Sequence, residues 1–238
     1  MTGARYLNLN LGLGAALVAL GAAAWYAVVL QSSGMAMAMD ISVPVYLLTW
    51  VTMMAAMMLP AIAPLAVAYG RVAIARGGGR LAALPFSAGY FLVWTAAGLV
   101  PLAVFVWSRG AVAGMSASSL GKVALGGVLV LAGLYQISPW KGACLRACRS
   151  PLGFVMNHNF ESGATGGVLA GAANGAFCLG CCWALMAVLM VAGLMSLPWM
   201  AATAVLILAE KNWRYGLRLA PFAGVAMVLV GTGIAVAL

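Results

Sequence analysis

The scarcity of charged side chains is the feature that most constrains how this chain folds. Of its 238 residues, 6% are Asp, Glu, Lys or Arg and 66% are hydrophobic. A soluble globular domain carries about 25% charged residues, so this composition does not provide for a solvated surface and indicates lipid surroundings. We therefore expect an all-α fold, a polytopic membrane helix bundle.

Apolar runs long enough to cross a bilayer, about 20 residues each, recur along the chain with short loops between them. We expect about seven transmembrane helices in a single transmembrane domain over residues 1–238, without a separate soluble domain. Pro101 predicts a kink in the third span. The predicted spans are 8–30, 43–70, 81–107, 120–138, 163–194, 197–209 and 219–238.

The loops between these spans predict the orientation, because cytoplasmic loops of membrane proteins are enriched in Lys and Arg. One side of the membrane holds only Arg109 and Lys122, and we therefore expect this side to be the outside. With seven spans, this places the N-terminus inside and the C-terminus outside. The net charge of +9 is then explained by basic residues that set the orientation in the membrane. We expect the partner of the chain to be the lipid bilayer of a bacterial inner membrane, and we expect no binding to nucleic acid. The other side collects Arg5, Arg71, Arg76, Arg80, Lys141, Arg146, Arg149, Lys211, Arg214 and Arg218.

The segment GATGGVLAGAANGAFCLGCCWALMAVLM, residues 163–190, combines small residues with cysteines. Glycines recur every four residues, a spacing that lets two helix backbones approach closely in lipid. At 100° per residue, Cys178 and Cys182 lie on the same arc as the glycines, with Cys181 at one edge and Met186 at the other. Soft sulfur ligands suit Cu(I) best; the alternative is that these cysteines only pack, as small apolar residues.

The segment MMAAMMLP, residues 53–60, carries two overlapping pairs of methionines one turn apart, Met53 with Met57 and Met54 with Met58. Both this segment and the cysteines fall near the middle of their spans, so the span 43–70 is expected to pack against the span 163–194 there. Neutral thioether ligands suit a low-dielectric site, where charge is costly. The alternative is that methionine fills gaps in the core.

Residues outside the spans offer secondary ligands on both sides of the bilayer. At the outer mouth, Met35, Met37, Met39 and Asp40 form either a collection site for a soft metal or an ordinary loop. On the inner side, His158 and Glu161 are either metal ligands or a proton relay, or else a polar helix start.

Two further features lie in the predicted basic loops. Cys144 and Cys148 either accept an ion on the cytoplasmic side or belong to an ordinary loop. Glu210 and Arg214 are spaced for a structural ion pair along one helix face.

The motifs MMAAMMLP at 53–60 and CLGCCWALM at 178–186 together resemble an uncharacterised bacterial family of predicted metal-binding integral membrane proteins. The resemblance covers most of the chain and implies a membrane location and a bound metal, without implying a reaction. The family pattern carries over to Met54, Met57, Met58, Cys178, Cys181, Cys182 and Met186.

These patterns favour Cu(I) handling, either transport or delivery to another membrane or periplasmic metalloprotein, with another soft or transition metal as the alternative. A membrane thiol-disulfide oxidoreductase using Cys178, Cys181 and Cys182 is a second hypothesis, and a structural subunit of a membrane complex is a third. No phosphate loop, hydrolase triad or carboxylate pair stands out in the sequence, so enzymatic activity is left open.

Overall fold

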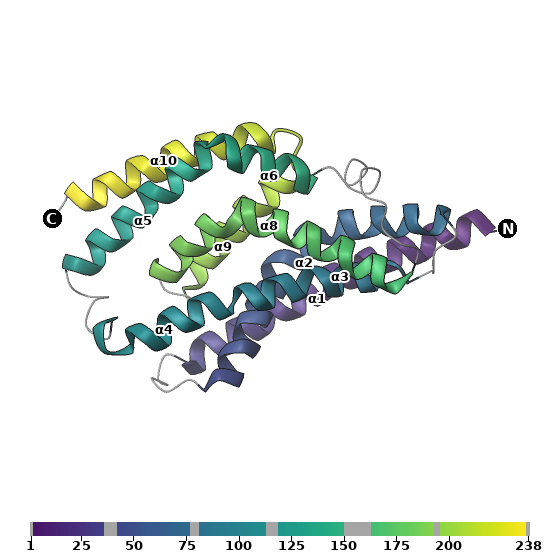
Figure 1. Cartoon of the computed structure of the whole chain (residues 1–238), viewed down its shortest axis with the longest axis horizontal. Helices are drawn as coiled ribbons and strands as arrows, with labels where there is room; N and C mark the ends of the chain where they lie inside the picture. The colour runs from purple at the N-terminus through teal and green to yellow at the C-terminus, as the bar shows by residue number, and fades with distance from the viewer. Residues whose placement is uncertain are drawn as a thin grey trace. The chain divides into compact units, whose positions relative to one another are not determined.

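The computed structural model describes residues 2–35, 42–76, 81–112, 119–149, 163–192 and 196–236. In this part of the chain all regular structure is helical (Figure 1), which confirms the all-α expectation. The helices are α1 (Thr2–Met35), α2 (Val43–Ala75), α3 (Ala83–Ala97), α4 (Leu99–Val112), α5 (Ser119–Ile137), α6 (Pro139–Arg149), α8 (Ala164–Ala192), α9 (Leu197–Asn212) and α10 (Gly216–Val236).

Several of these helices have the length and apolar composition that a bilayer crossing requires. A further candidate is the pair Val123–Ile137 and Pro139–Arg149, whose two helices meet at an angle of 64°. The count of seven spans, their single domain and their orientation stay predictions. By length and composition, five described segments qualify: Gly12–Ser32, Val43–Ala75, Ala83–Val104, Ala164–Ala192 and Gly216–Val236.

Two expectations about helix boundaries were wrong. The third predicted span is interrupted at Gly98, between α3 and α4, rather than at Pro101. Pro101 lies in the first turn of α4, where a backbone N–H group has no acceptor within the helix, so a proline there costs no hydrogen bond. In the predicted loop 139–162, residues 139–149 form the helix α6, which starts with a proline at a favourable first position.

The chain divides into two compact units, residues 1–96 with 147–177 and residues 97–146 with 178–238. In the first unit, α1 packs on α2 through Gly14 and Gly21. A Cβ atom on Gly21 would lie 2.9 Å from the ring of Pro60, so only glycine permits this separation. Between α2 and α3, the indole N–H of Trp50 donates to the carbonyl of Trp94 over 2.9 Å.

The glycines of α8 that belong to the first unit pack against α3. Gly171 of α8 faces the carbonyl of Phe86, and Gly89 of α3 faces the carbonyl of Val168, so each helix offers a glycine to the backbone of the other. The glycine spacing therefore predicted a close helix contact correctly. The contacts at these glycines are with α3, and the expected contact of the span 43–70 with this helix at the cysteines stays a prediction.

The second unit has its own pair of closely packed helices, α5 and α10. Gly133 and Gly224 face one another's carbonyl groups, and Gly126 and Gly231 do the same one heptad away; a Cβ atom on any of the four would lie 2.6–2.8 Å from that carbonyl oxygen. Leu129 and Ala132 of α5 pack in this unit with Ala184 and Val188 of α8. This core holds the cysteine-bearing half of α8 in place.

Candidate metal centre

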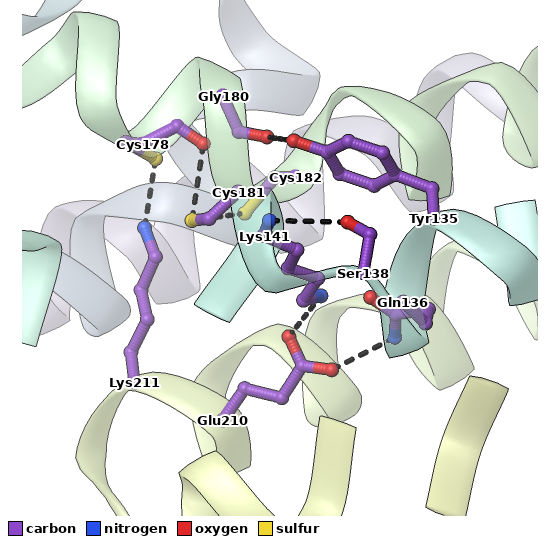
Figure 2. Close-up of polar contacts among 10 residues, drawn as sticks. All are labelled: Tyr135, Gln136, Ser138, Lys141, Cys178, Gly180, Cys181, Cys182, Glu210 and Lys211. Atoms are coloured by element: carbon purple, nitrogen blue, oxygen red, sulfur yellow. Dashed lines mark hydrogen bonds and ion pairs between the residues drawn. The ribbon is translucent and has the colours of Figure 1, made fainter. Parts of the chain in front are cut away.

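Three cysteines of α8 bring their sulfur atoms together inside the second unit. Cys178, Cys181 and Cys182 have exposed fractions of 0%, 1% and 1%, and the Sγ atoms of Cys181 and Cys182 are 3.3 Å apart. The thiol of Cys181 donates to the carbonyl oxygen of Cys178 over 3.2 Å (Figure 2). The Sγ atoms of Cys178 and Cys181 lie within 4.8 Å of one another, so the three thiols form one group, which we call the α8 cysteine group.

This grouping follows from helical geometry. Residues three and four positions apart lie on the same helix face, which brings both Cys181 and Cys182 beside Cys178. Cys181 is expected at the edge of this face, and its sulfur lies within the group. Trp183, the residue that follows Cys182, lies off this face and is 49% exposed.

Lys211, in the last turn of α9, points its ammonium group into the α8 cysteine group. Its Nζ atom donates to the Sγ atom of Cys178 over 2.8 Å (Figure 2). Hydrogen bonds with an ionised partner are stronger than neutral ones. Lys211 was expected only as a loop charge that sets topology, and its contact with Cys178 was not predicted.

A buried charge, that of Glu210, lies one residue before the partly buried Lys211. Glu210 accepts from the Nζ atom of Lys141 over 2.7 Å and from the Nε2 atom of Gln136 over 2.8 Å (Figure 2). Lys141 and Glu210 are 0% and 1% exposed, and a buried charge of this kind requires a partner. The predicted pair of Glu210 with Arg214 was wrong, because the guanidinium of Arg214 lies over the ring of Tyr215.

A tyrosine of α5 and a fourth cysteine, on α6, contact α8 at Gly180. The hydroxyl of Tyr135 donates to the carbonyl of Gly180 (Figure 2), and the Sγ atom of Cys144 lies 3.0 Å from where a Cβ atom on Gly180 would be. Cys144 thus lies in a helix of the second unit, beside α8, rather than in a loop.

The methionines proposed as ligands are buried, but their ligation stays a prediction. Met53, Met54, Met57 and Met58 lie in α2 within the first unit, and Met186 lies on α8 within the second. Their convergence on one ion with the cysteines is likewise a prediction. Met35 is the last residue of α1. Outside the described residues lie Met37, Met39, Asp40, His158 and Glu161.

Comparisons with known proteins identify a family. Neither a curated protein nor a solved structure matches this chain. Residues 47–234 match the family described as PpoB2, copper chaperone. The matched range includes both the methionine segment of α2 and the α8 cysteine group, and it covers well over half of the sequence. This chain therefore belongs to the PpoB2 copper chaperone family.

Proposed function

We propose that this protein binds Cu(I) through Cys178, Cys181 and Cys182 within a membrane and delivers it to another membrane or periplasmic metalloprotein. The observation that carries the proposal is the α8 cysteine group itself, with three buried sulfur atoms gathered on one helix face and an ammonium group 2.8 Å from one of them. Membership of a copper chaperone family supports copper as the cargo.

The chemistry of the donor set favours Cu(I) over harder ions. Thiolates are soft ligands that prefer Cu(I) to Mg²⁺, Ca²⁺ or Mn²⁺, which prefer oxygen. The ammonium of Lys211 favours an ion of lower charge, because in a low-dielectric interior it repels a divalent ion more strongly than it repels Cu(I).

We propose that methionines act as neutral ligands for copper on its way to and from the cysteines. We include Met53, Met54, Met57 and Met58 of α2 and Met186 of α8 as thioether ligands that bind copper weakly on its way to or from the cysteines. A thioether adds no charge, so copper exchanges between sulfur atoms without creating a buried anion. We infer a lipid bilayer as the surroundings because several apolar helices have the length that a bilayer crossing requires.

Burial of the cysteines disfavours the alternative of a thiol-disulfide oxidoreductase. Disulfide exchange requires an attacking thiolate to reach a sulfur atom directly, and the three sulfur-bearing residues are at most 1% exposed. A metal ion, which is far smaller than a protein partner, enters such a group more readily.

Copper content tests the proposal. We expect the purified wild-type protein, loaded with Cu(I) without oxygen, to retain copper, and the triple variant Cys178→Ser/Cys181→Ser/Cys182→Ser to retain little, because the hydroxyl is a poor ligand for a soft ion. The measurement is copper per protein by mass spectrometry. Ala184→Ser, which adds a hydroxyl at a buried position of the same helix, is the matched control. Equal copper in the triple variant and this control would exclude the α8 cysteine group as the site.

Charge selectivity gives a second test. Lys211→Met keeps the length of the side chain but removes its charge, and we expect the affinity for Cu(I) relative to Zn(II) to fall by about tenfold or more, since one charge at this distance is worth more than ~1.4 kcal/mol. Competition with chelators specific for each ion measures the ratio. Lys211→Arg, which keeps the charge, and Arg214→Met, in the neighbouring turn, are expected to retain the wild-type ratio. An unchanged ratio in Lys211→Met would show that the ammonium does not select the ion.

A further inference from the structure

The last turn of α9 carries two adjacent charged side chains that point in different directions. Neighbouring residues of a helix are about 100° apart around its axis. Glu210 reaches side chains of α5 and α6, whereas Lys211 reaches the Cys178 sulfur of α8 (Figure 2). The rotation of this one turn about the helix axis therefore sets the place of the ammonium beside the α8 cysteine group.

Glu210 is the last buried residue of α9. Lys211 is only partly buried, and it is the next-to-last residue of a helix that ends at Asn212. Helix ends fray, so the position of Lys211 depends on how the last turn is held. Residues three or four apart share one helix face, and such spacing relates the buried residues of this helix. They are Met200, Thr203, Ile207 and Glu210.

Two other helices hold the carboxylate of Glu210. Its Oε1 atom accepts a hydrogen bond from the Nε2 atom of Gln136 over 2.8 Å, and its Oε2 atom accepts one from the Nζ atom of Lys141 over 2.7 Å. Hydrogen bonds are directional, so two of them on the two oxygens of one carboxylate fix its orientation as well as its position. We call Gln136, Lys141 and Glu210 the Glu210 network.

The composition of the Glu210 network indicates a role other than stability. The Oε1 atom of Gln136 is buried and has no hydrogen-bond partner in the part of the chain that the structure describes, and a buried polar atom without a partner is unfavourable. Buried ion pairs often stabilise a fold no more than apolar side chains of similar volume would, and in some proteins they instead specify one arrangement. The arrangement specified here is that of the last turn of α9 against α5 and α6.

We propose that Glu210 is a positioning residue for metal selection, which holds the last turn of α9 so that the Lys211 ammonium stays against Cys178. This inference rests on the proposed function of the α8 cysteine group. A side-chain tip lies about 5–6 Å from the axis of its helix, so a rotation of about 20° moves it by about 2 Å. Such a shift breaks the hydrogen bond of 2.8 Å between Lys211 and Cys178 and moves the charge that disfavours divalent ions.

The variant Lys141→Met/Glu210→Leu removes the ion pair of this network. It keeps the net charge, the cysteines and Lys211, and unlike Glu210→Gln it leaves no buried ammonium without a counter-charge. Competition with chelators specific for Cu(I) and for Zn(II) measures the ratio of the two affinities on full-length protein. We expect this ratio to fall by about fivefold or more, because the effect of a charge on an ion weakens with distance. The copper content is expected to stay that of the wild type.

Thr203→Val is the matched control for this variant. It changes a buried polar side chain on the same face of α9 and leaves the Glu210 network intact. We expect it to retain the wild-type ratio of affinities.

A combination with Lys211→Met shows whether Glu210 acts through Lys211. If it does, the triple variant Lys141→Met/Glu210→Leu/Lys211→Met has the same ratio of affinities as Lys211→Met alone, because no ammonium remains to be positioned. Two independent contributions would instead multiply. A merely structural or long-range electrostatic role of the network therefore gives a further fall in the triple variant.

Each outcome decides the inference. A fall of the ratio that occurs only while Lys211 is present supports it. A wild-type ratio in Lys141→Met/Glu210→Leu overturns it, and so does a further fall in the triple variant. Loss of bound copper from Lys141→Met/Glu210→Leu also overturns it, because the network would then hold the cysteines rather than the lysine. Failure of the wild-type protein to retain copper instead rejects the proposed function, and the copper content reports that separately from the ratio.

Discussion

Replacing Glu210 with alanine is expected to lower the free energy of unfolding by about 3–5 kcal/mol. The change leaves the ammonium of Lys141, which is 0% exposed, without its counter-charge. The amide of Gln136 loses its acceptor as well. Unfolding in mixed detergent and dodecyl sulfate, followed by tryptophan fluorescence, measures the loss.

The double variant Lys141→Met/Glu210→Leu separates charge burial from packing. It removes both charges and keeps similar side-chain volume, and buried ion pairs replaced in this way lose little stability or gain some. We therefore expect it to unfold closer to the wild type than Glu210→Ala does. Equal destabilisation of the single and double variants would show that volume, rather than the unpaired lysine, is responsible.

Gly171→Ala is expected to cost more than the ~1–3 kcal/mol that overpacking normally costs. Its Cβ atom would collide with the carbonyl of Phe86, and because backbone cannot rotate aside as a side chain does, α3 and α8 must separate. The expected result is a markedly lower melting temperature and a poor yield of monodisperse protein in size-exclusion chromatography.

Two glycines without near neighbours provide the matched controls for Gly171→Ala. At Gly12 and Gly127 a Cβ atom would have nothing within 4 Å, and alanine favours a helix over glycine by up to about 1 kcal/mol. Gly12→Ala and Gly127→Ala are therefore expected to melt at or slightly above the wild-type temperature. A Gly171→Ala protein that melts with them would contradict the α3–α8 contact.

Helices were predictable from this sequence because long apolar runs and glycine spacing are local properties. The glycines on α8 predicted a close contact, but the partner was harder to choose, because Gly89 of α3 is an isolated glycine without a repeating pattern. The methionines of α2 suggested a partner for α8 because of their residue type, whereas the contact at the α8 glycines depends on the shape of α3.

The cysteines of the candidate site were predictable from their spacing, and the surrounding charges were not. Lys141 and Lys211 follow apolar runs, where lysines ordinarily remain in loops and set topology. Their burial depends on how α6 and α9 pack in the second unit, which no local pattern encodes. Glu210 is a usable signal for these contacts. The chain has three acidic residues, and one that directly follows an apolar helix is expected to pair with a positively charged side chain.

The glycine pairs of α5 and α10 have a consequence for motion. Gly126 and Gly133 are seven residues apart, as are Gly224 and Gly231, so both contacts form only in one register of the two helices. If one helix slid along the other by one turn, about 5.4 Å, the glycines of both pairs would lose the carbonyl groups that they face, and both contacts would be lost together. The two helices therefore move together as one rod, and the bend of 64° between α5 and α6 lies at Ser138, the residue between them.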